Sequence, residues 1–312
     1  MKIGILGDLH LTNMSPKRRI DDYWKTLCRK MSEALYTFDE HDCDVVIQVG
    51  DFFDSPTVAR RVSSETIQLL HCFGRADDRQ VLCIWGQHDV SGHSKATLPN
   101  SPLYALESAR VVKILNAKPV KFLGHEHSDI SIYGASFGES VPEVSNKNAY
   151  NVLVTHRMIG DRRLWPAQVL PGPTQFLLKH PDYDLILAGD YHYRFIENYD
   201  GRTIINPGAI VRKTIGRFDL EHRPAVVIFD TDTSDTKIVE LNVKSPEKVF
   251  DLTSGTKKKD NVILKELVRR LKEGDRKLAG WKSILVQVFK KTKSSKGVRK
   301  VIDETLEEVK NG

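Results

Sequence analysis

The chain has 312 residues, of which 40% are hydrophobic and 28% charged, a globular balance that excludes collagen-like, disordered and disulfide-stapled classes. This length is enough for about two domains. No apolar run approaches the roughly 18 residues of a membrane span, and the four cysteines lack zinc-site spacing. We therefore expect a cytoplasmic protein kept in a reducing compartment.

The positive charge is concentrated at one end. Residues 257–312 hold 17 Lys and Arg against 8 Asp and Glu, whereas residues 1–256 hold 30 against 33. Such asymmetry favours an anionic partner, for example a nucleic acid. A pair of solvated, Lys-rich helices would give the same counts, so charge alone leaves the choice open.

Short runs rich in Val, Ile and Leu have the length and composition of buried strands. They cover residues 2–6, 45–49, 81–85, 150–154 and 185–188. Apolar residues spaced by three and four predict helices over 20–38 and 63–73, the second capped by Ser63 or Ser64. Because strands and helices alternate, we predict an α/β sheet with its ligands at the carboxyl ends of the strands.

Further strands are predicted over 130–133, 203–205, 225–229 and 237–243. The first domain, a layered sandwich, then covers residues 1–243. Beyond Ser245-Pro246, helical patterns at 261–272 and 298–310 flank a strand pattern at 284–289. Residues 244–312 are therefore predicted to form a small α/β appendage that carries the basic excess.

Each of the five first strands is followed by a side chain that can bind a metal. The stretches read Asp8-Leu9-His10, Gly50-Asp51-Phe52-Phe53-Asp54, Gly86-Gln87-His88-Asp89, Thr155-His156 and Gly189-Asp190-Tyr191-His192. A carboxylate between two cations can bridge them, as in the two-metal sites of phosphoryl transfer. Asp, His and amide ligands without a thiolate suit manganese or a similar divalent ion.

In this order, the stretches resemble the motifs of the calcineurin-like metallophosphoesterases, over about residues 1–230. Within that family the chain looks most like the SbcD-type DNA repair nuclease subunit, including phage-encoded relatives. The segment Ile205-Asn206-Pro207-Gly208-Ala209 is also similar to the family stretch that follows the last His motif. The resemblance implies an α/β/β/α sandwich with a small C-terminal α/β capping domain.

The resemblance also implies a role for each motif residue. Asp8, His10, Asp51 and His192 would surround one ion, and Asp51 would bridge to a second ion held by Gln87, His156 and Asp190. His88 would face the scissile phosphate and assist the leaving oxygen, while Asp89 would orient the ring of His88.

Two residues depart from the family pattern. Gln87 stands where the family has Asn and adds one methylene, and Asp190 replaces the first His of the last motif. Both keep an oxygen ligand, and the carboxylate of Asp190 favours manganese or magnesium over zinc. The resemblance implies two ions, manganese first and magnesium as the alternative.

A second stretch spells the last motif of the family. Gly124-His125-Glu126-His127 precedes His156 and lies between strand-like runs 120–123 and 130–133, where a hairpin turn is expected. Motif order therefore favours Asp190 and His192, with His125 and His127 as loop residues.

The leading hypothesis is a two-metal DNA exonuclease or endonuclease of end processing, repair or recombination. The alternatives are another esterase of the family, acting on a nucleotide, pyrophosphate or phosphoprotein, and a DNA-binding scaffold with weakened catalysis. Ser55-Pro56 stands where the protein phosphatases of this family have Arg-Gly. The candidate DNA contacts are Arg60, Arg61, Lys290, Lys291 and Lys293. The SbcD resemblance implies an SbcC-like ATPase partner and a homodimer.

Overall fold

The computed structural model describes residues 1–74, 81–123, 129–164 and 168–252. Met1–Arg163 and Gln168–Asp251 form one compact unit, to which the following description refers. Residues 244–251 belong to this unit, where a bridge pairs Phe250 with Arg19. The appendage was predicted over 244–312, and its residues 253–312 lie outside the described part of the chain.

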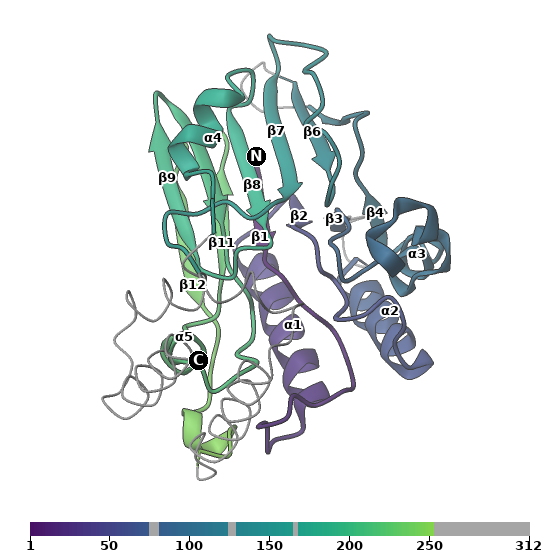
Figure 1. Cartoon of the computed structure of the whole chain (residues 1–312). Helices are drawn as coiled ribbons and strands as arrows, with labels where there is room; N and C mark the ends of the chain where they lie inside the picture. Colours follow the sequence, from purple (N-terminus) through teal and green to yellow (C-terminus); the bar gives the residue numbers. More distant parts are fainter. Residues whose placement is uncertain (75–80, 124–128, 165–167, 253–312) are drawn as a thin grey trace, which may run out of the picture. The chain divides into compact units, whose positions relative to one another are not determined.

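Two six-stranded sheets make up the centre of the unit (Figure 1). The first has the order β12-β11-β1-β2-β3-β4, in which β1 to β4 are parallel and β11 and β12 antiparallel. Its strands are β1 (Lys2–Leu6), β2 (Val45–Gln48), β3 (Val81–Cys83), β4 (Val112–Ile114), β11 (Ala225–Asp230) and β12 (Thr236–Glu240).

The second sheet has the order β5-β6-β7-β8-β10-β9, with β6, β7, β8 and β10 parallel. Its strands are β5 (Val120–Phe122), β6 (Ile130–Ala135), β7 (Tyr150–His156), β8 (Leu185–Gly189), β9 (Phe195–Tyr199) and β10 (Arg202–Asn206). The helices are α1 (Tyr23–Glu40), α2 (Arg60–Gly74), α3 (Pro102–Ser108), α4 (Pro173–Lys179) and α5 (Arg217–Glu221). Short 3₁₀ turns cover Ser91–His93, Lys95–Asn100 and Pro246–Lys248.

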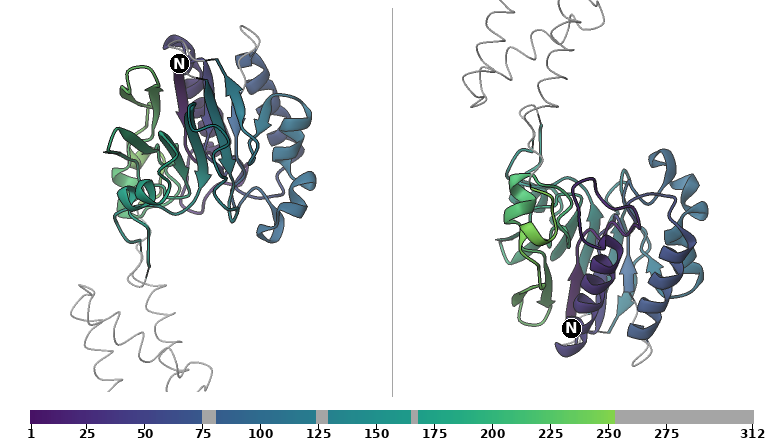
Figure 2. Two further views of the ribbon diagram at one scale, coloured as in Figure 1. Left: turned by 90° about the horizontal axis from the view of Figure 1, so that it is seen from above. Right: turned by 90° about the horizontal axis from the view of Figure 1, so that it is seen from below.

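Three apolar clusters define the layers (Figure 2). Ile5 and Ile47 of the first sheet pack with Val154 of the second, so the sheets face each other. The other face of the first sheet packs against α1 through residues such as Phe38, and the outer face of the second sheet packs against Phe176 of α4. The order is helix, sheet, sheet, helix, which confirms the predicted α/β/β/α sandwich.

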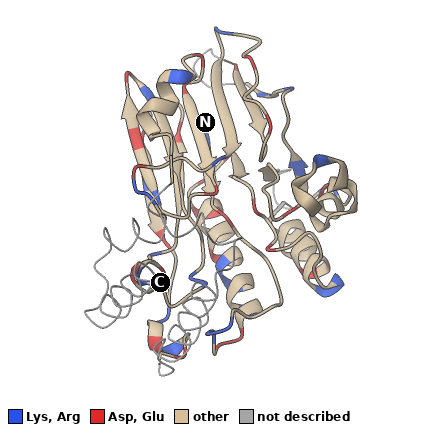
Figure 3. Ribbon diagram, viewed as in Figure 1, with Lys and Arg blue, Asp and Glu red and all other residues tan. Residues whose placement is uncertain are grey.

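Packing explains why the strands read as apolar runs. Both faces of β1, β2 and β8 are covered, and these strands are mostly buried. Figure 3 accordingly shows the inner strands largely without charge, while Lys, Arg, Asp and Glu lie on helices, loops and outer strands. Gly4 of β1 leaves room for the ring of Phe38, because a Cβ there would lie 2.6 Å from that ring.

Within the described residues the predicted strands are all present with bounds within a few residues, and β5 pairs with β6 as the antiparallel partners expected of a hairpin. The strand predicted over 284–289 lies outside those residues. The predicted start of the second helix is wrong, since α2 begins at Arg60 and both Ser63 and Ser64 lie inside it. Among the described helices, none is long and apolar enough to cross a membrane.

Candidate metal centre

The loops after β1 and β2 are joined by main-chain hydrogen bonds. The amides of Leu9 and His10 donate to the Asp51 carbonyl at 3.2 and 2.9 Å, and Leu11 bridges to Phe53. This pairing brings the side chains that follow two neighbouring parallel strands to the same edge of the sheet.

Three of the predicted ligands have left-handed backbone conformations. The φ angles are +48° at His10, +50° at Asp51 and +73° at Asp190. Residues other than glycine adopt this region at a cost of about 1–3 kcal/mol each, and such strain clusters at functional sites. The fold therefore holds these three side chains in directions that an unstrained loop would not give.

Glycines make room for the close approach of the ligands. A Cβ on Gly86 would lie 2.1 Å from Asp51 Oδ1, and one on Gly189 would lie 2.7 Å from His156 Nδ1. The glycine in these two strand-end motifs is thus required by packing of the site.

One group of side chains gathers around Asp8, His10 and His192, whose ligand atoms lie within 4.8 Å of one another. The Nε2 atoms of His10 and His192 are 3.2 Å apart, and His192 Nε2 is 3.3 Å from Asp8 Oδ2. Two nitrogens have a similar spacing when both bind one ion at about 2.1 Å. Asp8 and His10 are buried and His192 is partly exposed, so one side of this group opens to solvent.

A second group lies beside it. His156 Nε2 is 3.4 Å from Asp51 Oδ2, and the His156 Nδ1–H donates to the Val49 carbonyl at 2.7 Å. That bond turns the Nε2 atom toward the site. Gln87 Nε2 donates to Asp190 Oδ1 at 2.8 Å, so these two predicted ligands also meet.

Asp51 connects the two groups. Its Oδ2 atom lies 3.8 Å from His10 Nε2 and 3.4 Å from His156 Nε2, which belong to different groups. The side chain is 1% exposed, and its Oδ1 atom accepts a hydrogen bond from the His88 amide at 2.9 Å. The carboxylate is therefore held by the protein through one oxygen and faces both groups with the other.

Unsatisfied atoms test whether metal ions fit this site. Asp51 Oδ2, Gln87 Oε1 and His156 Nε2 are buried without a hydrogen-bond partner. Buried polar atoms rarely remain unpaired, and each such atom costs about 1–3 kcal/mol. All three are metal-ligand atoms, and the donor set of carboxylate, imidazole and amide suits divalent ions. The residues present fit the predicted centre.

The charges respond to one another as expected for a compact set of acids and bases. Burial opposes the charge on both His156 and Asp51, yet their mutual attraction raises the pKa of His156 to about 10 and lowers the pKa of Asp51. Burial raises the pKa of Asp190. Burial also lowers the pKa of His10, and the nearby charge of Lys213 lowers it further.

His88 lies at the edge of the site with its side chain 44% exposed. Its Nε2 atom is 4.0 Å from Asp51 Oδ2, and its Nδ1 atom lies 3.2 Å from the Asp54 main-chain carbonyl. The carbonyl thus holds the ring and leaves Nε2 facing the site. The prediction that Asp89 orients this ring is wrong, because the partner of His88 Nδ1 is the Asp54 main-chain carbonyl.

Asp89 is instead part of the framework under the site. It is fully buried, and its two oxygens accept hydrogen bonds from the amides of Phe52, Phe53 and Gly86 at 3.2, 2.8 and 2.8 Å. Burial and the charge of Asp51 raise the pKa of Asp89 to about 7, against the pull of these amides. Asp89 ties the Asp51 loop to the loop after β3.

Two residues at the site have no role in the sequence-based interpretation. Asp54 belongs to a quoted motif, and its Oδ1 atom is 3.2 Å from His10 Nδ1. Lys213 forms an ion pair with the same carboxylate. Opposing burial, His10 and Lys213 lower the pKa of Asp54 to about 2. The motif could have marked Asp54, but a single Lys in a loop gave no signal.

The remaining predicted residues lie elsewhere. Arg60 and Arg61 are exposed at the start of α2, where Arg61 pairs with Glu65 at 2.6 Å. The other predicted DNA contacts, Lys290, Lys291 and Lys293, lie outside the described residues. So do His125 and His127, which the sequence predicts to be loop residues.

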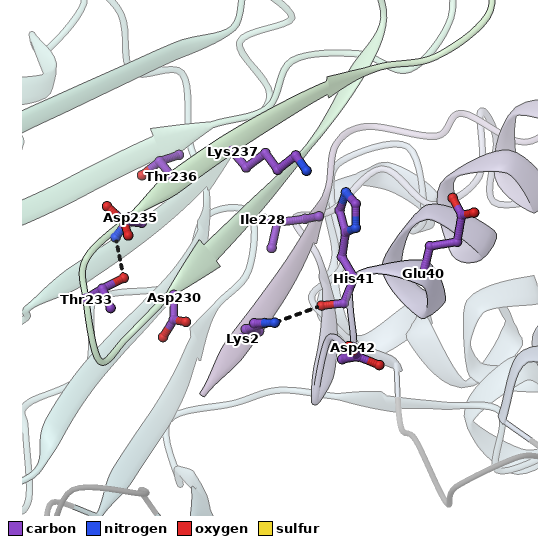
Figure 4. Close-up of a pocket in the computed structure, with 10 residues that line it drawn as sticks. All are labelled: Lys2, Glu40, His41, Asp42, Ile228, Asp230, Thr233, Asp235, Thr236 and Lys237. Atoms are coloured by element: carbon purple, nitrogen blue, oxygen red, sulfur yellow. Dashed lines mark hydrogen bonds between the residues drawn. The ribbon is translucent and has the colours of Figure 1, made fainter.

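A cavity of about 500 Å³ lies at the opposite end of β1, away from this site (Figure 4). It is lined by Lys2, Glu40, His41, Asp42, Ile228, Asp230, Thr233, Asp235, Thr236 and Lys237. Lys2 begins β1 whereas Asp8 and His10 follow it, so this cavity contributes nothing to the metal centre.

Comparison with known protein families agrees with the fold. The family model of the calcineurin-like phosphoesterase superfamily domain matches residues 1–234. The chain belongs to this superfamily, whose members are metal-dependent phosphoesterases. A search of curated proteins finds no match.

Several solved structures are similar to this chain at low identity. An archaeal phosphodiesterase is 17% identical with a TM-score of 0.40, covering 77% of this chain and 100% of its own. A putative 5′-nucleotidase from Staphylococcus aureus, in complex with α-ketoglutarate, is 15% identical with a TM-score of 0.45, covering 85% of this chain and 57% of its own. A dimetal phosphatase from Danio rerio is 11% identical with a TM-score of 0.44, covering 73% of this chain and 92% of its own.

Proposed function

We propose that the protein is a two-metal-dependent DNA nuclease of the SbcD type, an exonuclease or endonuclease that cleaves phosphodiester bonds in end processing, repair or recombination. The observation that carries the metal-dependent part is the position of Asp51. One buried, unpaired oxygen of this carboxylate faces His10 of one ligand group and His156 of the other. This is the arrangement that a bridging ligand requires.

The predicted ligands form two sets, one for each ion. Asp8, His10, Asp51 and His192 would hold one ion, and Asp51, Gln87, His156 and Asp190 the second. Bound there, divalent ions polarise the phosphate and activate water. The mixed, thiolate-free ligand set with its extra carboxylate at Asp190 favours manganese, with magnesium as the alternative.

His88 is the candidate acid. It contacts no carboxylate closely, since Asp51 Oδ2 is 4.0 Å from its Nε2 atom, and it is the most exposed of the residues that face the site. The Asp54 carbonyl holds the ring through Nδ1, which leaves Nε2 as the atom that would face the leaving oxygen and assist its departure. His88 therefore serves catalysis without being required as a metal ligand.

The choice of DNA as substrate has separate support. The sequence places a strong excess of Lys and Arg in residues 257–312, and a basic segment attracts the phosphate backbone. The resemblance to SbcD-type subunits further suggests an SbcC-like ATPase partner, a homodimer and a cytoplasmic location, which we include in the proposal.

The test is cleavage of plasmid and linear DNA, compared with bis(p-nitrophenyl) phosphate, nucleotides, pyrophosphate and a phosphopeptide, each with manganese and with chelator. Manganese-dependent cleavage of both DNAs supports the proposal. Hydrolysis of a nucleotide, pyrophosphate or phosphopeptide without DNA cleavage would replace it by another phosphoesterase activity. DNA binding with no hydrolysis of any substrate would leave a binding scaffold.

The basic segment is tested by changing Lys290, Lys291 and Lys293 to Gln. Each phosphate contact on duplex DNA contributes about −0.9 to the slope of log affinity against log salt. The triple variant should bind DNA more weakly and with a flatter slope, while the small diester is hydrolysed at the wild-type rate. An unchanged slope would remove this segment from the DNA-binding surface.

A further inference from the structure

Lys213 brings a cation to the open side of the metal centre. It lies in the loop between β10 and α5, and its Nζ atom pairs with Asp54 Oδ1. The side chains of Lys213 and Asp54 are 25% and 28% exposed, so the pair is reached from solvent. No motif includes this residue.

The backbone on which Lys213 stands is held on both sides. The amide of Ile210 donates to the Asp8 carbonyl at 3.2 Å, and the guanidinium of Arg19 donates to the Arg212 carbonyl at 2.7 Å. Arg212 is itself buried and donates to the Lys244 carbonyl. Lys213 therefore extends from a fixed point beside the ligand Asp8, which favours a specific role over that of a mobile surface charge.

Asp54 lies between the amine of Lys213 and the predicted metal ligand His10. Its Oδ1 atom accepts from the amine and lies 3.2 Å from His10 Nδ1. The Nε2 atom of His10, on the far side of the ring, is the one that faces Asp51 and His192. A carboxylate and an imidazole ring thus separate the amine from the ligand atom of His10.

The amine of Lys213 keeps donors for an anion. It has three N–H groups, and the Asp54 carboxylate accepts from one side of it. Lys213 and His88 both adjoin Asp54, the first at its carboxylate and the second at its main-chain carbonyl, and both side chains reach solvent. Because phosphates of one strand follow each other at short intervals, a cation near the reacting phosphate attracts its neighbour.

We propose that Lys213 forms a second phosphate subsite, which binds the phosphate adjacent to the one that is cleaved and so favours polynucleotides over isolated diesters. This inference rests on the proposed nuclease function and deepens it. If Lys213 only positioned Asp54 and His10, its loss would slow the hydrolysis of every substrate equally.

The test compares Lys213→Gln with wild type on a single-stranded oligonucleotide and on bis(p-nitrophenyl) phosphate, which has no neighbouring phosphate. We expect kcat/KM for the oligonucleotide to fall about tenfold to a hundredfold, the range for a lost hydrogen bond between charged groups, and to fall at least tenfold more than for the small diester. Lys213→Arg should recover most of the loss. Lys147→Gln is the matched control, since Lys147 pairs with Asp182 at 2.8 Å near the amino end of β7.

Two further readouts do not depend on turnover. Bound manganese, measured by mass spectrometry, should be the same in Lys213→Gln as in wild type. In a His88→Ala background, the salt slope for binding a labelled oligonucleotide should flatten by about 0.7, the value for one contact on a single strand.

The outcomes distinguish failure of the Lys213 subsite from failure of the proposed nuclease function. Equal losses on both substrates, with less bound manganese, would show a positioning role and overturn the subsite. Unchanged kinetics and an unchanged salt slope would also overturn it. A wild-type enzyme that hydrolyses the small diester but not the oligonucleotide would refute the nuclease function itself, and the subsite with it.

Discussion

Replacing Asp89 by Ala tests whether this residue acts as framework. The carboxylate accepts three main-chain hydrogen bonds, from Gly86, Phe52 and Phe53, in a fully buried position. Removing it leaves three amides without an acceptor, and each unsatisfied buried group costs about 1–3 kcal/mol. Water entering the vacated space would reduce this sum, so we expect a loss near its lower end, about 3 kcal/mol.

The expected loss converts to a measurable shift in Tm. For a folded unit of this size, 1 kcal/mol lowers Tm by about 2–4 °C, so Asp89→Ala should lower it by roughly 6–12 °C. The assay is calorimetry with a chelator present, which removes the stabilisation that bound metal adds. His88→Ala is the control, because the exposed ring makes one hydrogen bond and its loss should change Tm little.

The alternative role gives the opposite pattern. If Asp89 acted only by orienting His88, Asp89→Ala would slow the reaction while leaving Tm within about 1 °C of wild type. That result would refute the framework interpretation.

Three further changes have defined outcomes. His88→Ala should reduce the rate about 10²–10⁴-fold with bound manganese unchanged, and loss of manganese in that variant would make His88 a ligand. Asp190→Ala should cripple hydrolysis, whereas combined His125→Ala and His127→Ala should leave it largely intact, and the reverse ranking would overturn the motif order. Burial lowers the pKa of Lys30 from 10.5 to about 8, so the unfolded chain binds more protons between these values and Lys30 contributes a rise in the free energy of unfolding as pH increases from 8 to 10.5. The raised pKa of His156 contributes a fall up to about pH 10, so the measurement is the difference between wild type and Lys30→Met in denaturant titrations. The wild-type free energy of unfolding should rise relative to that of Lys30→Met, and equal pH dependence would contradict the assignment.

The sheets were predictable because burial on both faces leaves a simple signal. Strands such as β1 and β8 are continuous apolar runs, and the polar residue that ends each run marks the edge where ligands meet. Strand β9 lacks this signal because most of it is exposed, as expected at the edge of a sheet. The start of α2 was missed because Ser63 and Ser64 resemble caps in sequence, although the helix already begins at Arg60.

The residues that gather at the candidate site were predictable from motif order and residue type, whereas the partners of individual atoms were not. Asp89 follows His88 directly, yet it bonds to amides from the loop after β2, a choice made by tertiary packing. Lys213 reaches Asp54 across 159 positions of sequence, and no local pattern predicts such a contact. Sequence motifs therefore identified the residues that gather at the site, and the structure was needed to find the residues that support them.

The bridging role of Asp51 is tested most directly by the anomalous scattering of manganese in crystals soaked with that metal. Two peaks are expected in wild type, one among Asp8, His10 and His192 and one beside His156, both adjacent to Asp51. In Asp51→Ala at least one peak should disappear, together with DNA cleavage. Two undiminished peaks in Asp51→Ala, or wild-type peaks away from these side chains, would contradict the two-metal assignment.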